Sequence, residues 1–550
     1  MFRKYGFIFA VLLLPLLTCA GLPHKNISVL SRGVWYKLAV VNSGIHRITF
    51  QDLEALGIDM TALDPAKIRL FGNGSGMLPE ANAAMRIDDL RENSILVEDG
   101  GDGRFNPSDY ILFYGESPDK WLFDKNTHLF YHQKNLYSDT TFYFLTVDTQ
   151  PGLRIQPVES TSMVPNYNAV RFDDYACYEE DQVNLIRSGK EWYGEIFDNN
   201  KRVWDFTFFF PHIDSLSPIR LRSYVAAKAS VASYFIIICN GKRVDSLRIE
   251  PTDPGDLSRF CKLKTKPSVI TNPKSDQKIT MEYSLPQNNS LGWLNYLEIN
   301  CVRNLVWDGP QMFFRSTNSY GEGKVTQFFL QKATSAIQVW DITDPAAIGA
   351  VQTTLSDSLL KFRLQTDSLR QFVAFDGSQY LPVIIKGTIP NQNLHSANPT
   401  NLVIVSAPEF LAQAWQLADF HRQHNDITAQ VVTTKTIFNE FACGNPDPTA
   451  IRDFMKLLTD KADSGLAPRY LLLLGDGSYD PKNRIPGNNN FVPTFQSSES
   501  LSPTASYVTD DYFGIMGDTS GQEANGNIGI GIGRFPVSDT STAQIMVNKI

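Results

Sequence analysis

The sequence lacks the features that mark several common classes of protein. It has no long run of basic residues, and its net charge is -8, so it carries no electrostatic footprint for nucleic acid. It also has no P-loop, no GxGxxG dinucleotide loop and no GxSxG nucleophile elbow. Beyond the N-terminal leader, no segment is apolar enough to span a membrane. These absences argue against binding of nucleic acids or nucleotides and against a membrane-spanning body.

Cysteine is scarce, scattered and never paired as CxxC, which excludes the common zinc and thioredoxin motifs. In an exported protein, a disulfide between two of Cys239, Cys261 and Cys301 and buried free thiols are both open alternatives. Cys443 lies in a loop before a predicted helix. A nucleophilic cysteine needs a base within reach, and none can be placed beside it, so we do not predict that Cys443 is catalytic.

The N-terminus has the pattern of a secretory signal peptide. A short basic start is followed by an apolar run over Tyr5–Leu17 and by small residues that offer cleavage after Ala20. The run is too short to cross a bilayer with ease. Residues 1–20 are therefore predicted to direct export. Lipidation at Cys19 is the alternative, although Thr18 is a poor match for the position before a lipidated cysteine.

Two β-rich regions come next. Residues 21–160 alternate short strands with turns, and apolar residues such as Leu38 and Val40 recur there with a period of two. Residues 161–386 contain strong strands such as Trp204–Phe210, and we predict a sandwich of antiparallel sheets. The aromatic share of 12% favours such sheets, because flat rings pack well on pleated surfaces.

The pattern changes after a polar linker at residues 387–401. From residue 402 to residue 550, buried strands alternate with amphipathic helices, which predicts right-handed βαβ units and a parallel sheet. The predicted strands are Leu402–Val405, Ala429–Val432, Tyr470–Leu474 and Ile528–Ile532. The predicted helices are Phe410–His424, Thr449–Lys461 and one that begins between Ser538 and Ser541, where Ser541 and Gln544 have the spacing of a capping box. The fold class is therefore multidomain, with mostly-β, sandwich-like domains followed by an α/β domain.

The α/β domain is interpreted as incomplete. Ile545, Met546 and Ile550 still follow a helical pattern, and no Gly, Pro or basic last turn closes that helix. The parallel sheet has only three or four predicted strands. We therefore expect further strands beyond Ile550.

Four polar residues are candidates for lining or supporting a site. In open parallel sheets, ligands bind beyond the carboxyl ends of the strands. Asp476 directly follows the strand that ends at Leu474, and it either lines a site or bonds to its own turn. Asp510 and Asp511 lie in a later acidic segment. Arg534 either orders these loops by pairing with Asp510 or Asp476, because its planar fork binds a carboxylate with two hydrogen bonds, or is a solvated arginine at a strand end.

One segment partly follows a calcium loop. Glu98, Asp102 and Asp109 fall at positions one, five and twelve, but Gly100 occupies position three, where an oxygen ligand is needed. A structural calcium ion and an ordinary Asp/Gly turn are both left open. No cofactor is required by any other pattern.

The motifs, taken in order, resemble the gingipain family of cysteine peptidases, and within it the surface sortases of the type IX secretion system of Bacteroidota. The ordered set of motifs is specific and spans nearly the whole mature chain. In the C-terminal part the segments that carry the resemblance are Asn439–Phe454, Tyr470–Asp480, Phe491–Ser497, Tyr507–Gly514 and Gly531–Val537. In the N-terminal half they are Gly33–Tyr36, Gly72–Pro79 and Phe105–Tyr114.

The resemblance implies a caspase-like peptidase domain behind the β domains. It implies that a Cys thiolate attacks a peptide carbonyl, with a His as general acid and base and backbone amides around the oxyanion. In the family, a Gly-His-Gly motif and a later Cys both follow the segment that matches Gly533–Phe535. The sequence has no Gly-His-Gly motif and stops soon after that segment. No catalytic residue is therefore assigned, the dyad is expected beyond Ile550, and the 550-residue chain is expected to be inactive alone.

The resemblance also implies partners and a location. A sortase of this kind removes C-terminal secretion signals from cargo proteins and joins the cargo to lipopolysaccharide. We therefore expect cargo proteins, lipopolysaccharide and outer-membrane secretion proteins as partners, and a peripheral position on the outer membrane at the cell surface. The alternative is a non-catalytic surface scaffold with a degenerate peptidase-like domain.

Overall fold

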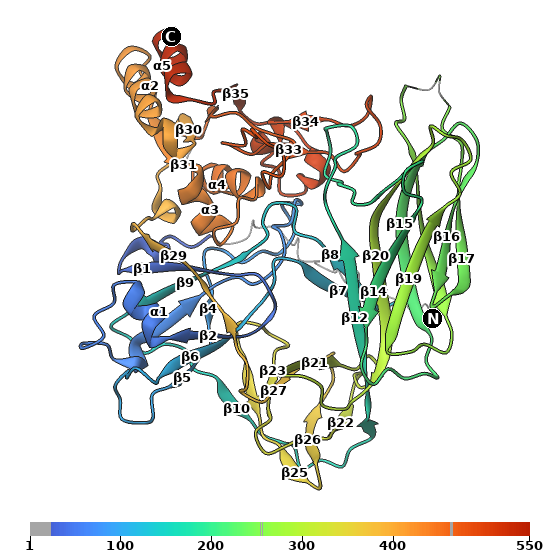
Figure 1. The fold of residues 1–550 in the computed structure, drawn as a ribbon. Coiled ribbons are helices and arrows are strands. Elements are labelled where there is room, and N and C mark those ends of the chain that lie inside the picture. Colours follow the sequence, from blue (N-terminus) through green and yellow to red (C-terminus); the bar gives the residue numbers. More distant parts are fainter. Residues whose placement is uncertain (1–23, 254, 256, 463–465) are drawn as a thin grey trace, which may run out of the picture.

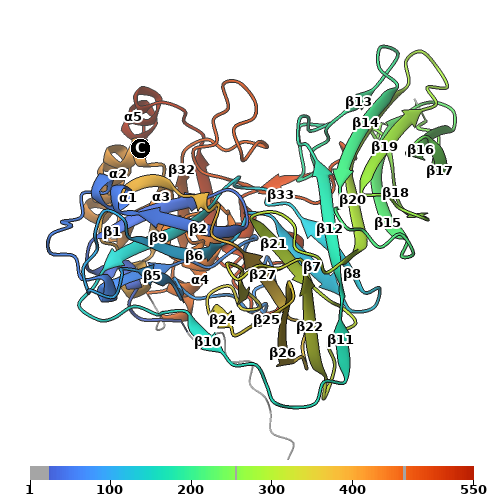
Figure 2. The same ribbon diagram turned by 60° about the horizontal axis from the view of Figure 1, so that its bottom comes forward.

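The computed structural model describes residues 24–253, 255, 257–462 and 466–550. The predicted leader, residues 1–20 with Cys19, lies outside the described residues. Figure 1 shows an N-terminal β unit with an α/β unit above it on one side, a long sandwich on the other side, and a connecting β unit below. Figure 2 gives the same arrangement from a second direction. No described helix is long and apolar enough to cross a membrane.

The N-terminal β unit consists of two sheets that share one core. Their strand orders are β29-β1-β9-β3-β4 and β28-β2-β6-β5. Apolar side chains from both sheets meet between them, among them Leu38, Ile48 and Phe113, none of which is exposed. The strands are β1 (Trp35–Val40), β2 (Gly44–Thr49), β3 (Ile68–Phe71), β4 (Glu92–Asn93), β5 (Leu96–Glu98), β6 (Tyr110–Gly115), β9 (Thr141–Val147), β28 (Leu381–Pro382) and β29 (Ile384–Ile389).

The N-terminal β unit also carries one short α-helix and two 3-10 turns. The helix α1 (Phe50–Ala55) begins at Thr49, whose side chain accepts from the backbone N–H of Asp52 while the Asp52 carboxylate accepts from that of Thr49. The 3-10 turns are η1 (Val29–Ser31) and η2 (Pro65–Lys67).

The connecting β unit is a second pair of sheets, ordered β10-β24-β23-β27-β21 and β11-β22-β26-β25. Its core is aromatic, with Phe314, Phe328, Phe362 and Phe372 in mutual ring contact. The strands are β10 (Gln156–Val158), β11 (Tyr167–Ala169), β21 (Gln311–Arg315), β22 (Val325–Gln331), β23 (Gln338–Asp341), β24 (Gly349–Val351), β25 (Thr354–Ser356), β26 (Leu359–Gln365) and β27 (Gln371–Phe375).

The long sandwich is formed by residues 171–304, which lie between β11 and β21 in the chain. Its sheets are ordered β12-β20-β15-β18, with β13 at the end of β20, and β14-β19-β16-β17. Alternating side chains of both sheets, such as Phe206, Ile237 and Leu297, fill the space between them. The strands are β12 (Arg171–Glu179), β13 (Ile196–Phe197), β14 (Val203–Phe209), β15 (Ile219–Lys228), β16 (Ser233–Cys239), β17 (Lys242–Ile249), β18 (Lys262–Ile270), β19 (Asp276–Tyr283) and β20 (Leu291–Asn304).

Residues 161–386 therefore contribute to two separate pairs of sheets, where we predicted one sandwich, and β10 joins one of these pairs from the preceding interval. The end of this interval contributes β28 and the first half of β29 to the N-terminal β unit. β29 continues to Ile389, so the first three residues of the predicted linker 387–401 are paired with β1 instead. A period-two pattern predicts that a segment forms a strand. It does not specify which strand, distant in the sequence, that segment will pair with.

The α/β unit has a parallel sheet ordered β31-β30-β32-β35. Figure 1 shows α2 and α5 together on one side of this sheet and α3 and α4 on the other. The strands are β30 (Leu402–Ser406), β31 (Ala429–Thr433), β32 (Tyr470–Leu474) and β35 (Gly531–Phe535), and a two-stranded pair is formed by β33 (Phe495–Gln496) and β34 (Val508–Thr509). The α-helices are α2 (Leu411–His424), α3 (Thr434–Phe441), α4 (Thr449–Asp460) and α5 (Thr540–Asn548). The 3-10 turns are η3 (Leu394–Ser396), η4 (Pro408–Phe410), η5 (Asp511–Gly514) and η6 (Gln522–Ala524).

The predicted parallel sheet is confirmed, and three local details differ from the prediction. The last strand begins at Gly531, because Ile528 instead bridges to Ile515 outside the sheet. The last helix is capped by Asp539, whose carboxylate accepts from the backbone N–H of Thr542, and Ser541 lies inside its first turn. The helix α3 was not predicted.

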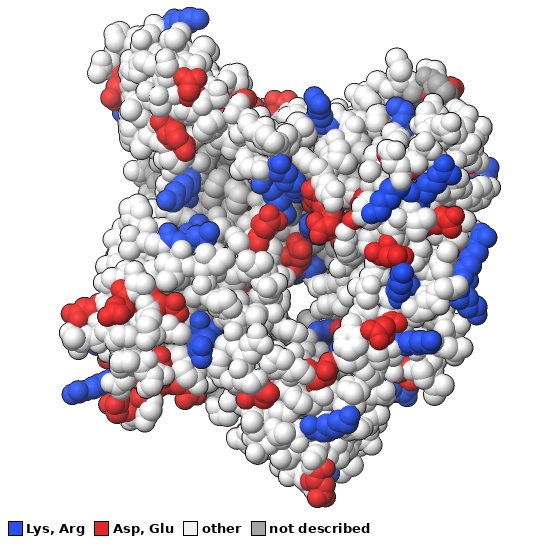
Figure 3. Space-filling model, viewed as in Figure 1, with Lys and Arg blue, Asp and Glu red and all other residues white. Residues whose placement is uncertain are grey.

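The N-terminal β unit is joined to the α/β unit by the loop between β3 and β4. Arg86 Nη1 lies 2.5 and 2.6 Å from the two carboxylate oxygens of Asp453 on α4. The backbone N–H of Leu78 donates to Asp447 over 2.8 Å. From the long sandwich, Lys190 contacts Glu80 of this loop and also Glu523 of the α/β unit. Charged side chains thus connect three units. Figure 3, drawn in the view of Figure 1, shows acidic and basic residues interspersed over the middle of the molecule.

Candidate functional site

The carboxyl ends of β32 and β35 are joined by Arg534. Its Nε lies 2.7 Å and its Nη2 2.6 Å from the two oxygens of Asp510. Its Nη1 donates to the backbone carbonyls of Gly475 and Val492 over 2.9 and 2.7 Å. The side chain is 13% exposed, so these bonds are largely shielded from water. Of the two carboxylates predicted as partners of Arg534, it is Asp510 that binds the guanidinium.

Asp476 orders the same edge mainly through its backbone. Its carbonyl accepts from the N–H groups of Phe491 and Val492, each over 3.0 Å, and its N–H donates to Val537. Its carboxylate accepts from the backbone N–H of Gly477 over 2.9 Å, which is the bond to its own turn that we considered. The carboxylate is half-buried, at the end of β32.

Gly475 allows two segments to approach closely at this edge. Its φ is +145°, and an added Cβ would lie 2.9 Å from atoms of both Phe491 and Val492. A larger residue therefore has no room here, and the turn after β32 depends on glycine.

Asp511 lies beside Asp510 but is exposed, and its backbone N–H donates to Thr509. The ring of its neighbour Tyr512 is buried between Phe495 and Arg452. The four candidates therefore divide into a paired couple, Arg534 with Asp510, and two carboxylates, Asp476 and Asp511, that do not bond to that arginine.

Asp480 is a buried residue that sequence reasoning did not single out. Its carboxylate accepts from the N–H of Ile485 over 2.8 Å and from Arg484 over 3.1 Å. Arg484 also contacts Asp181 and lies over the ring of Trp192, both near the long sandwich. The loop after β32 is thus held in place by contacts with the long sandwich. The signal in the sequence that could have marked Asp480 is its place in the segment GDGSYD, four residues after Asp476.

Cys443 does not have the environment of a nucleophile. Burial raises the pKa of its thiol to about 12, and Sγ lies 3.3 Å from the carbonyl oxygen of Phe142. The five described cysteines are all free, so no disulfide joins Cys239, Cys261 or Cys301.

Two of the three residues of the partial calcium loop, Asp102 and Asp109, bond to their own turns. The Asp102 carboxylate accepts from the backbone of Arg104 and the side chain of Asn106. The Asp109 carboxylate accepts from the backbone of Asn106 over 2.6 Å. Glu98 ends β5. Calcium binding by Glu98, Asp102 and Asp109 stays a prediction.

A different group of potential metal ligands was missed. Among the described residues, His132, Cys177 and Glu179 bring one ligand atom each within 4.8 Å of one another. They come from β12 and from the hairpin of β7 (Lys120–Asp124) and β8 (Leu129–Gln133). His132 is remote from the other two in sequence, so no spacing motif marks the group.

Comparison with known proteins finds a family match in the C-terminal part of the chain. Residues 395–550 match the family model Peptidase family C25. The matched segment contains the helix-flanked parallel sheet, so the peptidase-like part of the chain is the α/β unit.

The particular similarity extends far beyond that region. The crystal structure of dimeric latent PorU from Porphyromonas gingivalis matches with a TM-score of 0.82 and 26% identity, covering 96% of this chain and 50% of that chain. The chain therefore spans about half the length of the PorU chain that it resembles, and the predicted resemblance to the N-terminal portion of such a protein is confirmed.

Other matches are weak. A carbohydrate-binding module CBM36 in complex with calcium and xylotriose has a TM-score of 0.16 and 14% identity, covering 22% of this chain and 98% of that chain. A CBM36-1 domain of a xylanase from the hindgut metagenome of Trinervitermes trinervoides has a TM-score of 0.15 and 10% identity, with coverages of 23% and 96%. TM-scores this low do not indicate a shared fold with this chain. No curated protein matches the chain.

Proposed function

We propose that the chain is the N-terminal part of a cell-surface cysteine endopeptidase of the sortase type. It would remove C-terminal secretion signals from cargo proteins of the type IX secretion system and attach the cargo to lipopolysaccharide. The observation that carries this proposal is the similarity in fold to PorU over 96% of the chain. The match of residues 395–550 to Peptidase family C25 supports the peptidase chemistry.

In this proposal, Arg534 and Asp510 are positioning residues. They hold the segments after β32 and β34 at the edge of the sheet where ligands bind in open parallel folds. Asp476 and Asp511 would line the site. The catalytic Cys and His would be supplied by residues beyond Ile550, with no cofactor required.

The proposed setting is the outer surface of the cell. The predicted leader would export the chain, which would lie peripherally on the outer membrane with cargo proteins, lipopolysaccharide and secretion-system proteins as partners. A calcium ion at Glu98, Asp102 and Asp109 belongs to the same set of proposals.

The second candidate function is that of a non-catalytic scaffold with a degenerate peptidase-like unit. The observation behind it concerns the Cys and His that do lie together, Cys177 on β12 and His132 on the β7–β8 hairpin. Burial raises the pKa of the Cys177 thiol to about 11, which does not suit a nucleophile.

Reading and expressing the gene downstream of codon 550 tests both candidates. The chain joined to the following segment, and the 550-residue chain alone, would be incubated with a cargo protein bearing a C-terminal secretion signal. We expect cleavage by the longer protein, its loss on replacing a His and a Cys of the added segment, and none by the shorter one. A stop directly after codon 550, or a longer protein without a His and a Cys at strand ends, would favour the scaffold. Cleavage by the short chain would refute our assignment of the dyad.

A further inference from the structure

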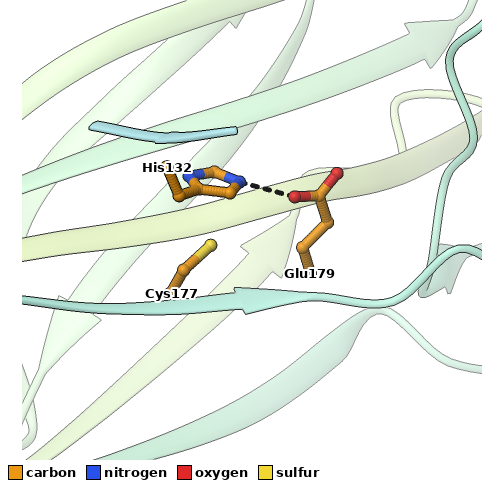
Figure 4. Close-up of side chains that lie close together, drawn as sticks. All are labelled: His132, Cys177 and Glu179. Atoms are coloured by element: carbon orange, nitrogen blue, oxygen red, sulfur yellow. Dashed lines mark hydrogen bonds and ion pairs between the residues drawn. The ribbon is translucent and has the colours of Figure 1, made fainter. Parts of the chain in front are cut away.

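His132, Cys177 and Glu179 form a compact group between two units of the chain. Figure 4 shows the imidazole, the thiol and the carboxylate pointing toward one another. The His132 Nε2 atom lies 2.5 Å from a carboxylate oxygen of Glu179, and the three ligand atoms lie within 4.8 Å of one another. Cys177 and Glu179 are two positions apart on β12, so both side chains leave the same face of the sheet.

The imidazole is oriented by a fourth residue. His132 Nδ1 lies 2.8 Å from Oε2 of Glu298, and the same oxygen accepts from the backbone N–H of His132 over 2.7 Å. Arg222 in turn donates to that oxygen over 2.9 Å. Metal-binding histidines commonly bond through their other nitrogen to a carboxylate, which fixes the ring and its tautomer. Here that arrangement leaves Nε2 facing Cys177 and Glu179.

The two segments are held in place independently of this group. The amide side chain of Asn300 on β20 makes two hydrogen bonds, of 2.7 and 2.8 Å, to the backbone of Phe130 on β8. The ring of Trp121 on β7 stacks on Tyr175 of β12 at 3.9 Å. The side chains of His132 and Glu179 are 8% and 14% exposed, and that of Glu298 is 3% exposed. The ligand atoms are therefore presented by rigid strands in a shielded place.

We propose that this group is a structural zinc site, with His132 Nε2, Cys177 Sγ and a Glu179 carboxylate oxygen as ligands and a water molecule as the fourth. Nitrogen, sulfur and oxygen together suit zinc, whereas calcium and magnesium take oxygen ligands. A thiolate and one carboxylate neutralise the two charges of the ion, and Arg222 balances Glu298. The contact of Nε2 with Glu179 would open by roughly 1 Å to reach tetrahedral zinc distances.

The site would tie the β7–β8 hairpin of the N-terminal part to the long sandwich. The test uses the whole purified chain, stripped with a chelator, dialysed against zinc chloride and washed. We expect about one zinc ion per chain by elemental analysis and a zinc-dependent rise in the melting temperature. Cys177→Ser and His132→Gln should lose the bound zinc. Glu298→Gln, which removes the charge that orients the imidazole, should weaken zinc binding by about tenfold or more.

Cys239→Ser is the matched control, because Cys239 is a buried strand cysteine of the same sandwich. It should retain the zinc of the parent chain. If a ligand variant fails to fold, cobalt replaces zinc in the parent chain, and a thiolate-to-cobalt charge-transfer band is expected. Zinc content no higher in the parent than in Cys177→Ser, or a cobalt complex without that band, would mean that the group is only an ion pair and would overturn the proposal.

Discussion

Arg534 and Asp510 meet in a two-point contact, with both nitrogen–oxygen distances below 2.8 Å. The same guanidinium bonds to the carbonyls of Gly475 and Val492. One side chain therefore holds three segments that are distant in the chain at the edge of one sheet. Only a planar group with several donors can make these contacts at once.

Replacing Arg534 by Lys should remove most of these bonds and leave Asp510 partly unpaired. We expect a loss of about 1–3 kcal/mol in the free energy of unfolding, measured by urea denaturation, with faster proteolysis of residues 475–514. Arg248→Lys is the control, since its pair with Glu250 is 55% and 61% exposed and should change stability by less than about 1 kcal/mol. Equal losses for the two variants would contradict the role assigned to Arg534.

Gly475→Ala tests the close approach after β32. The added Cβ would lie 2.9 Å from Phe491 and Val492, so the loops must separate. We expect a loss of about 1–3 kcal/mol in unfolding free energy. Gly387→Ala has a positive φ of +91° but no atom within 4 Å of the added Cβ, so it reports the backbone cost alone. Thermal unfolding of both variants should separate the steric cost from the backbone cost, and a smaller loss at Gly475 would be inconsistent with a crowded turn.

The Arg86–Asp453 pair should contribute to the attachment of the N-terminal β unit to α4. The two side chains are 14% and 9% exposed, so removing one leaves the other poorly solvated. Arg86→Ala is expected to lower the free energy of unfolding by about 2–4 kcal/mol, and Arg86→Ala with Asp453→Asn by less than the sum of the single changes. Arg91→Ala serves as control, because its pair with Asp344 is 42% and 46% exposed. Simple additivity at Arg86 and Asp453 would argue against coupling.

His395 should make stability depend on pH. Burial alone would lower its pKa, but hydrogen bonds with Asp88 and Glu440 outweigh it and raise the pKa of His395 to about 9. The folded pKa lies above the ordinary value, so this stabilisation is complete below about pH 6.5 and is lost as pH rises through about 9.

Unfolding of the parent chain and of His395→Gln across that window would test the dependence. The parent should lose about 1–3 kcal/mol more than the variant between pH 6 and 10. His424→Gln, at the exposed end of α2, should follow the parent. Parallel curves for the parent and His395→Gln would rule out the role of His395.

The Cys443 thiol should be inert in the folded chain. Its pKa is raised to about 12 by burial, so the reactive thiolate is scarce at neutral pH. We expect no labelling of Cys443 by a thiol reagent at pH 7.5, as read by mass spectrometry of peptides, and full labelling in denaturant. Cys443→Ser would provide the matched blank. Rapid native labelling would mean that Cys443 is more accessible than its packing against Phe142 indicates.

Local patterns in the sequence were sufficient for several elements. The apolar run Tyr470–Leu474 was predicted as a strand and is β32, because five consecutive apolar residues have few alternatives beside turn residues. The helix α3 was missed because Thr433 both ends β31 and caps the helix, so no loop separates the two. Arg534 could be placed near an acidic segment from its position at a strand end.

Long-range relationships could not be predicted. Nothing in residues 381–389 indicates that they pair with β1 and β2, more than 300 residues earlier. For the same reason His132 could not be connected with Cys177, since a side chain on a hairpin and one on a sandwich strand meet only through tertiary packing. Asp480 was overlooked because its burial depends on Arg484 and a distant unit.

The pairing of β1 with β29 has a consequence for the order in which the chain folds. Strand β1 can pair with its outer neighbour β29 only after residues 384–389 have been synthesised. A chain that folds as it is synthesised, N-terminus first, must therefore keep an open sheet edge while the two later β units form. Assembly of the N-terminal β unit is in this way a late event, completed just before the α/β unit is synthesised. Chaperones that shield unpaired strands would act most usefully in this interval.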